Sequence, residues 1–273
     1  MFTKAQTYIA SMQQPVEYAG ALRLFVRLVY AWFIISLFMT WDIRSLIWGP
    51  ETVLMRFGGA SNVTTNVAYA LVFKLSLFPW VFWTHLIGAI ASMFEFKYVW
   101  LPRLLTWFTG LLLFYAGYNA FNAGNVLMLA LAFYCIPVRT KTNDPFQHIL
   151  NHLSRTASIA QIVLLYLVAA LYKLNGDMWP SGEALYYTLE IERFSTDWIK
   201  NSGITHQWFL MKALTFGVMA YQFAFPVLIW FKKINTPLLL VGVLFHLTTG
   251  VVMHLWDFAL AMIFSYAIFL RKK

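Results

Sequence analysis

Apolar residues recur along this chain in long runs that are separated by short polar stretches. A helical run of about 20 apolar residues is long enough to cross the roughly 30 Å hydrocarbon core of a bilayer. The pattern therefore predicts an all-α, polytopic transmembrane helical bundle of about eight spans, forming a single domain over residues 1–273. We expect the spans at residues 22–40, 79–95, 101–118, 124–138, 158–174, 207–231, 236–253 and 256–270.

Two regions leave the number of spans open. Segment 236–270 is too long for one ordinary span, and only His254 and Asp257 interrupt it. It therefore forms either two short spans or one span and a re-entrant piece. Segment 66–78 contains Lys74 and is predicted to lie at the membrane interface.

The composition excludes a soluble enzyme. Hydrophobic residues make up 60% of the chain and charged residues only 11%, whereas a soluble domain is roughly 45–50% apolar and about 25% charged. The first apolar run contains Arg23 and Arg27 and lacks a small-residue cleavage site, so we expect no removable signal peptide. The single cysteine, Cys135, lies in an apolar run and is predicted to be a buried structural thiol.

The distribution of Lys and Arg predicts the orientation of the bundle. Cytoplasmic loops near span ends carry an excess of these residues, and the chain has a net charge of +9. With both termini cytoplasmic, the inner segments hold Lys4, Lys97, Arg103, Arg139, Lys141, Arg155, Lys232, Lys233, Arg271, Lys272 and Lys273, and the outer loops hold Arg44, Arg56, Arg193 and Lys200. We therefore expect an integral protein of a bacterial cytoplasmic membrane, surrounded by membrane lipids, with no nucleic-acid partner.

The longest predicted outer segment, residues 175–206, combines acidic and aromatic residues. Pro180 suits the first turn of a helix and Glu183 lies near the positive end of that helix, so a short amphipathic helix is expected here. The aromatic side chains are suited to the headgroup region, and a ligand platform is the alternative. These side chains are Trp179, Tyr186, Tyr187, Phe194 and Trp198.

Polar side chains inside the apolar runs are the candidate functional groups. A charged group near the bilayer centre costs on the order of 2.5–3.5 kcal/mol, so such groups mark function by default. The predicted topology places His246 and Gln222 near the middle of the membrane and the others in its outer half, which predicts an outward-facing pocket. Snorkelling of Lys173 and simple helix-tethering hydrogen bonds are the alternatives. The outer group comprises His85, Lys173, Lys212, His254 and Asp257.

Two pairs of polar residues have helical spacing. His254 and Asp257 are three apart and are predicted to share a helical face, either as an acid–base pair or as a helix tether. His148 and His152 are four apart, in a polar inner loop where a short solvated or interfacial helix explains them. The chain contains no zinc, nucleotide-binding or serine-hydrolase motif, so no metal site is expected.

Four segments together resemble the HTTM family, the membrane domain shared with vitamin K-dependent gamma-carboxylase. They are ALRLFVRLVYAWFIISLFMTWDIRSLIWGPETVL, YNAFNAGNVLMLALAFYCIPV, AALYKLNGDMWPSGEAL and FHLTTGVVMHLWDFALAMI. The third segment is the most specific, since it is similar to the carboxylase segment in which an apolar helix ends in a lysine-leucine-acid stretch followed by a tryptophan and a glycine. The resemblance extends over nearly the full chain.

This resemblance implies a site and a substrate class. Lys173 falls on the position of the proposed catalytic base that initiates oxygenation of vitamin K hydroquinone, and His246 falls on the histidine of a late helix. The implied cofactor or substrate is a quinone-type lipid. The catalytic candidates are Lys173, His246, His254 and Asp257, and the candidates for cofactor binding are His85, Asn125, Trp179 and Gln222.

The chain departs from the carboxylase in three places. It ends soon after the last apolar run. A histidine of the carboxylase is replaced around Gly124 and Asn125, and Gln222 stands where the family commonly has an acidic residue. Glutamyl carboxylation is therefore not expected. Short bacterial relatives resemble the membrane protein that helps to mature a sporulation-delaying peptide toxin, which indicates processing of a secreted peptide. The alternatives are a non-catalytic partner, chaperone or immunity protein for such a peptide or a neighbouring membrane subunit, and a small transporter.

Overall fold

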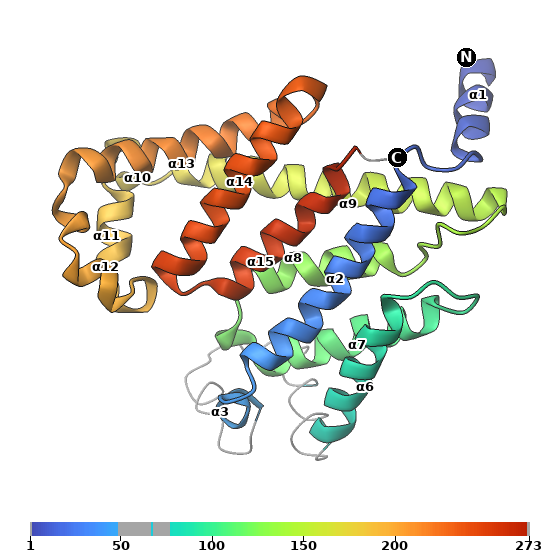
Figure 1. Ribbon diagram of the computed structural model, residues 1–273, viewed down its shortest axis with the longest axis horizontal. Helices are drawn as coiled ribbons and strands as arrows, with labels where there is room; N and C mark the ends of the chain where they lie inside the picture. The colour runs from blue at the N-terminus through green and yellow to red at the C-terminus, as the bar shows by residue number, and fades with distance from the viewer. Residues whose placement is uncertain (1, 49–66, 68–76, 272–273) are drawn as a thin grey trace. The chain divides into compact units, whose positions relative to one another are not determined.

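The structure is a computed structural model that describes residues 2–48, 67 and 77–271. Every regular element in this part of the chain is a helix (Figure 1). The prediction of an all-α protein is therefore confirmed for the described residues. The predicted interfacial segment 66–78 falls almost entirely outside them.

Each of the eight predicted spans contains a helix. The apolar runs therefore predicted helix positions well, with ends that differ by a few residues except at the start of α9. The helices are α2 (Ala19–Met39), α6 (Phe78–Ser92), α7 (Trp100–Ala116), α8 (Ala123–Cys135), α9 (Pro145–Leu174), α13 (Trp208–Leu228), α14 (Lys232–Met253) and α15 (Trp256–Ser265), the last continued by the 3₁₀ turn η5 (Tyr266–Phe269). Two further helices, α1 (Phe2–Met12) and α3 (Arg44–Trp48), lie in the amino-terminal part.

Four of these helices are both long and apolar enough to cross a membrane. They are α2, α9, α13 and α14, with 21, 30, 21 and 22 residues. The other predicted spans are shorter; α8, for example, has 13 residues, where about 17–25 residues are typical of a transmembrane helix. The structure therefore supports an integral membrane protein, and the count of eight spans stays a prediction.

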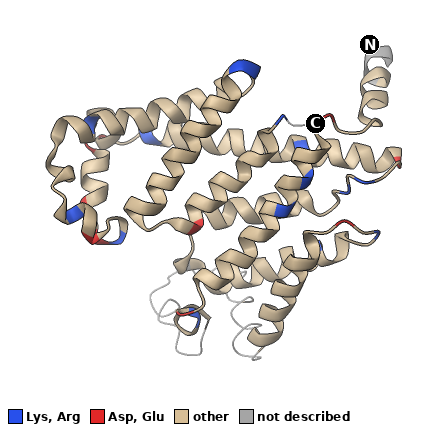
Figure 2. Ribbon diagram, viewed as in Figure 1, with Lys and Arg blue, Asp and Glu red and all other residues tan. Residues whose placement is uncertain are grey.

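The surface of the described residues agrees with this class. Large apolar side chains are exposed along the helices, including Phe209 at 86% and Trp80 at 75%. Figure 2 shows that charged residues lie mainly in turns and near helix ends. A surface of this kind is costly in water but favourable against lipid chains.

Helix α9 is longer than predicted because it begins in the polar inner loop. Asp144 accepts a hydrogen bond from the backbone N–H of Phe146 at 3.0 Å, and Pro145 occupies the first helical position. His148 and His152 therefore belong to the first turns of α9. The expected separate short helix is not present at these residues, since the helix continues without a break into the apolar run.

The chain breaks between α14 and α15 at His254. This residue caps α14 in the left-handed conformation with φ 55°, the only non-glycine residue with positive φ in the described part of the chain. Segment 236–270 therefore forms two helices, which fits both predicted alternatives, two short spans or one span and a re-entrant piece. The shared helical face predicted for His254 and Asp257 is wrong, because His254 ends one helix and Asp257 lies in the first turn of the next.

Segment 175–206 forms several short helices where one was expected. Gly182 adopts φ 84° and ends α10 (Met178–Ser181), which contains Pro180. Glu183 then directly precedes α11 (Ala184–Glu190), so Pro180 and Glu183 lie on opposite sides of a break. The 3₁₀ turns η3 (Glu192–Phe194) and η4 (Ile204–His206) flank α12 (Asp197–Asn201).

The chain divides into two compact units, which we describe separately. Unit 1 comprises residues 1–158 and 270–273, and unit 2 comprises residues 159–269. The boundary lies within the residues of α9. The prediction of a single domain stays a prediction, because a continuous helix contributes residues to both units.

Unit 1 is built around α2, α6, α7 and α8. Helix α6 packs along α7, and α2 contacts both α6 and α8. The fully buried Arg103 of α7 ties helix ends together: its guanidinium donates to the carbonyl of Ser92 at 3.2 and 3.3 Å, to that of Cys135 at 3.2 Å and to that of Val138. Carbonyls at helix C-termini carry partial negative charge, so they can satisfy a buried guanidinium.

Unit 2 contains the second half of α9 and the helices from α10 to η5. Helix α14 packs against α15, and the short α11 lies on α13. One stripe of α13 is buried, namely Met211, Thr215, Met219, Gln222 and Phe225. Successive positions are three or four apart, the spacing that places residues on one face of a helix.

Candidate functional site

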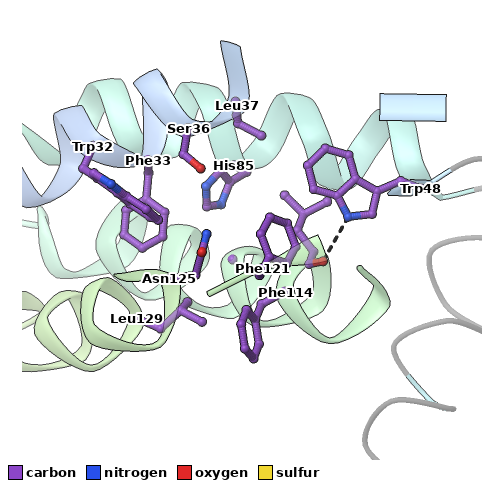
Figure 3. Close-up of a pocket in the computed structure, with 12 residues that line it drawn as sticks. Trp32, Phe33, Ser36, Leu37, Trp48, His85, Phe114, Phe121, Asn125 and Leu129 are labelled. Atoms are coloured by element: carbon purple, nitrogen blue, oxygen red, sulfur yellow. Dashed lines mark hydrogen bonds between the residues drawn. The ribbon is translucent and has the colours of Figure 1, made fainter. Parts of the chain in front are cut away.

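A cavity of about 40 Å³ lies inside unit 1 (Figure 3). Its lining comes from α2, α6, α7, α8 and the residues next to them. The polar side chains that face it are Ser36, His85 and Asn125, and its walls are aromatic or aliphatic. The aromatic residues are Trp32, Phe33, Trp48, Phe114 and Phe121.

His85 is held on the buried face of α6 by a threonine of α7. Its Nδ1 lies 2.9 Å from Oγ1 of Thr109, and that hydroxyl donates its own proton to the carbonyl of Leu105 at 2.7 Å. Thr109 must therefore accept from His85, so Nδ1 carries the ring proton. Nε2 of the neutral imidazole is then a hydrogen-bond acceptor.

Asn125 is positioned by the turn that starts α8. Its Oδ1 accepts from the backbone N–H of Asn122 at 3.0 Å, while the Asn122 side chain accepts from the N–H of Gly124 at 2.8 Å. This reciprocal capping arrangement fixes the Asn125 side chain and occupies its oxygen. The amide group points toward His85 across the cavity (Figure 3), which presents the –NH₂ as a donor.

The walls of the cavity are packed closely. The rings of Phe33 and His85 meet edge to face, with centroids 5.2 Å apart, and Trp48 donates to the carbonyl of Leu113 at 3.0 Å. Gly110 lies against the imidazole, where a Cβ atom would come within 3.1 Å of His85 Cε1. A glycine is therefore needed at this point for the ring to approach the helix.

In chemical terms, the cavity offers one acceptor and one donor between aromatic walls. A volume of about 40 Å³ has room for water, since roughly 10–15 Å³ suffices for one molecule. An aromatic ring needs on the order of 150 Å³, so a ring enters only if a wall residue moves. Phe121 is half-buried on the connection before α8, which makes it the wall residue with most freedom to move.

A second group of polar residues lies in the core of unit 2. His246 of α14 is buried, and its Nε2 lies 2.7 Å from the hydroxyl of Tyr166. Tyr166 in turn bonds to the hydroxyl of Tyr266, which lies 3.1 Å from that of Tyr221. Tyr221 donates to the carbonyl of Leu238 at 3.4 Å.

The direction of these hydrogen bonds follows from their end point. A carbonyl only accepts, so Tyr221 donates to Leu238, and the proton of each earlier tyrosine is then committed to the next. His246 must therefore donate from Nε2–H. Its buried Nδ1 is an acceptor with no hydrogen-bond partner among the described residues.

The tyrosines of this network were not among the predicted site residues. They are Tyr166, Tyr221 and Tyr266. The available signal was their position inside apolar runs, since a buried tyrosine hydroxyl needs a partner.

The structure brings Lys173 and Trp179 together. Lys173 lies in the last turn of α9, and its Nζ is 4.7 Å from the centre of the Trp179 ring. A cation over an indole face and at a helix C-terminus is favourable in both respects. Within the described residues of unit 2, no hydrogen bond joins Lys173 to His246.

The remaining predicted residues have different surroundings. His254 is exposed and Asp257 is half-buried in the first turn of α15. Gln222 is buried, and its Oε1 has no hydrogen-bond partner among the described residues. Lys212 is exposed. No group of three or more His, Cys, Asp or Glu in the described ranges is arranged to hold a metal ion.

The predicted pocket therefore divides between the two units. His85 and Asn125 face one cavity in unit 1, while Lys173, Trp179, Gln222, His246, His254 and Asp257 belong to unit 2. Comparison with known proteins adds nothing to this picture, because no family model, curated protein or solved structure matches the chain.

Proposed function

We propose that this chain is a polytopic membrane protein of the HTTM type that binds a quinone-type lipid, and that it acts on that lipid or on a secreted peptide. The observation that carries the proposal is the pairing of His85 and Asn125 across an aromatic cavity. A hydroquinone headgroup has flat apolar faces and two opposed oxygens, which match walls of this kind with one polar group on each side.

The tautomer of His85 favours the reduced form of such a lipid. Nε2 is an acceptor, so it pairs with a phenolic O–H and not with a quinone carbonyl. The amide –NH₂ of Asn125 donates to an oxygen of the ring. Because the cavity is smaller than a ring, binding requires displacement of Phe121.

The catalytic part of the proposal rests on the resemblance. Lys173 takes the position of the base, with His246, His254 and Asp257 as assisting groups. The buried Nδ1 of His246 has no hydrogen-bond partner among the described residues, so it is available to accept a hydrogen bond from a substrate hydroxyl. Glutamyl carboxylation is not part of the proposal, because the chain departs from the carboxylase at Gly124, Asn125 and Gln222.

Binding is tested with purified protein in lipid nanodiscs. Mass spectrometry of the natively purified protein should detect a bound quinone, and titration with a short-chain hydroquinone should give saturable binding. His85→Phe should weaken that binding about tenfold, the loss of one well-made hydrogen bond. His206→Gln is the control, because His206 is an exposed histidine of η4. Equal affinity of both variants would remove the proposed site.

Catalysis is tested separately from binding. Lys173→Met should abolish turnover of the hydroquinone or maturation of the peptide while binding in the unit 1 cavity persists. Full activity of Lys173→Met would remove Lys173 from the proposal and leave the binding site intact.

We also propose eight spans, with both termini in the cytoplasm of a bacterial cell. The sequence has a single cysteine, so a Cys135→Ala background allows single-cysteine labelling. A membrane-impermeant maleimide should label Glu183→Cys in intact cells and Lys141→Cys only after lysis. The opposite pattern would invert the topology.

A non-catalytic peptide partner is the second candidate, and the surface of segment 175–206 favours it. Trp198 is 62% exposed beside acidic residues, and Ile191 and Tyr187 are exposed as well. Such a surface suits a cationic, amphipathic peptide. A photo-crosslinker at Trp198 should capture a secreted peptide in producing cells, and a crosslinker at Tyr8 of α1 serves as the control. Equal capture at both positions would exclude a specific surface.

A further inference from the structure

Two turns of unit 1 are joined by hydrogen bonds. The turn between α6 and α7 contains Glu95 and Lys97, and the segment between α8 and α9 contains Arg139 and Lys141. Arg139 Nη1 donates to the carbonyl of Lys97 at 3.2 Å. Hydrogen bonds from the backbone N–H of Lys141 and from Thr140 to the Glu95 carboxylate hold the two segments together.

A cavity of about 170 Å³ lies at this junction. Lys97 and Arg139 line it together with Gln147 and Trp100. The nearby carboxylate of Glu95 is fully engaged, since it accepts at 2.7 Å from the Thr140 hydroxyl and at 2.9 and 3.2 Å from two backbone N–H groups. Arg23 Nε lies 3.6 Å from Glu95 Oε1, so the negative charge of this carboxylate is shared with Arg23, and Lys97 and Arg139 leave the cavity with net positive charge.

An apolar groove of about 380 Å³ adjoins this cavity. Pro137 lines both spaces, so the two lie next to each other at that residue. The groove is formed mainly by Leu104, Phe133, Ile136 and Leu153. Large apolar side chains in it are exposed, including Phe133 and Leu153.

Three separate segments each contribute residues to both the cavity and the groove. On α7 the cavity residue Trp100 precedes the groove residue Leu104, and on α9 Gln147 precedes Leu153. At the end of α8 the groove residue Phe133 comes before the cavity residue Arg139, because the chain there runs from the groove toward the cavity. Along α9, Gln147 lies in the polar first turns, and the groove residues approach the apolar run. The cationic cavity therefore lies at the polar end and the groove extends toward the hydrocarbon.

We propose that the cavity and the adjoining groove together form a binding site for an anionic phospholipid. The phosphate lies between Lys97 and Arg139, and one acyl chain lies along Leu104, Phe133 and Leu153. An arginine fork and an ammonium group match phosphate oxygens, and each cation near a membrane surface contributes about fivefold in affinity for anionic lipid. A zwitterionic lipid adds a cation of its own next to the phosphate, so it is disfavoured. A free phosphate leaves the groove unused.

The test measures lipid retention by native mass spectrometry after exchange in nanodiscs of equal phosphatidylglycerol and phosphatidylcholine. The wild-type protein should retain phosphatidylglycerol in preference by about tenfold or more, and Lys97→Gln should reduce this preference about fivefold. Lys232→Gln is the matched control, since it removes an exposed cation from the first turn of α14. Equal retention of the two lipids by the wild-type protein overturns the proposal.

The groove is tested by a second variant. Leu153→Trp fills the groove, and it should reduce retention of phosphatidylglycerol without removing either cation. Inorganic phosphate at millimolar concentration should not displace the lipid; displacement would show a phosphate site and overturn the lipid assignment. If Lys97→Gln lowers the thermal unfolding midpoint, its loss of lipid could come from unfolding, and Leu153→Trp then decides the outcome. Unchanged retention of phosphatidylglycerol in Leu153→Trp excludes an acyl chain in the groove.

Discussion

The hydroxyl of Tyr166 lies 2.7 Å from Nε2 of His246, and both side chains are buried in unit 2. Through Tyr166 the imidazole is connected to two further tyrosines and finally to the carbonyl of Leu238. Four elements, α9, α13, α14 and η5, therefore share one hydrogen-bonded chain. A network of this kind fixes the tautomer of His246 and also the relative positions of the helices in unit 2 that contribute to it.

Tyr166→Phe should destabilise the protein by about 2 kcal/mol, because it leaves His246 Nε2–H without an acceptor and removes one of the two hydroxyl partners of Tyr266. The free energy of unfolding in detergent measures this effect. Tyr172→Phe is the matched control, since Tyr172 lies on the same helix and is 73% exposed. Equal stability of the two variants would show that the network contributes no stability.

The buried Arg103 gives a second stability prediction. Arg103→Met should cost about 3–5 kcal/mol, because carbonyls of Ser92, Cys135 and Val138 lose a charged donor and stay buried. Arg103→Lys should recover only part of this loss. It keeps the positive charge, but an ammonium group cannot reach all the carbonyls that the planar guanidinium reaches. Lys141→Gln, an exposed cation of the same unit, controls for the change in net charge. A loss in Lys141→Gln as large as in Arg103→Met would point to net charge as the cause.

The positions of the helices could be predicted from the sequence, because one requirement dominates them. Long apolar runs that must satisfy their backbone hydrogen bonds within one segment form helices, as expected for the four runs that are long enough to cross a membrane. The eight predicted segments therefore contain helices with small differences at their ends. The long extension of α9 was missed because its first turns, around His148, are polar.

The site was harder to predict because it depends on single backbone angles and on contacts between helices. The pairing of His254 with Asp257 assumed a continuous helix, and the positive φ of His254 has no signature in composition or periodicity. Asn125, by contrast, lies in an Asn-rich turn whose capping role has a clear sequence pattern. Depth in the membrane grouped His85 with Lys173, although the structure describes them in different units.

Glu95 makes stability depend on pH. Burial alone raises the pKa of this carboxyl, but hydrogen bonds from Thr140 and Lys141 and the nearby Arg23 outweigh it and lower the pKa below the ordinary value of 4.5. A carboxylate with a depressed pKa in the folded state contributes stability that is present above the unfolded pKa and is lost as the pH falls through the folded pKa. This contribution is therefore complete at pH 7 and disappears at a pH below 4.5.

Glu95→Gln should accordingly cost about 1–2 kcal/mol at pH 7, and its difference from the wild-type protein should shrink at pH values below 4.5. Thermal unfolding in detergent between pH 7 and pH 3 measures the difference. Glu190→Gln, at an exposed position of α11, should show no such dependence. A difference that stays constant down to pH 3 would contradict the role of the ionised carboxylate.

Two helical glycines provide the last prediction, because they differ in what surrounds them. At Gly110 a Cβ atom would lie 3.1 Å from both His85 Cε1 and Leu129 Cδ2, while at Gly217 nothing lies within 4 Å. Gly217→Ala should therefore stabilise the protein by about 0.5–1 kcal/mol through helix propensity. Gly110→Ala gains the same propensity but must displace the imidazole and strain its bond to Thr109, so its net effect should be destabilising by about 1 kcal/mol. Unfolding midpoints of the two variants give the comparison, and a gain in stability at both positions would show that the wall of the cavity yields freely.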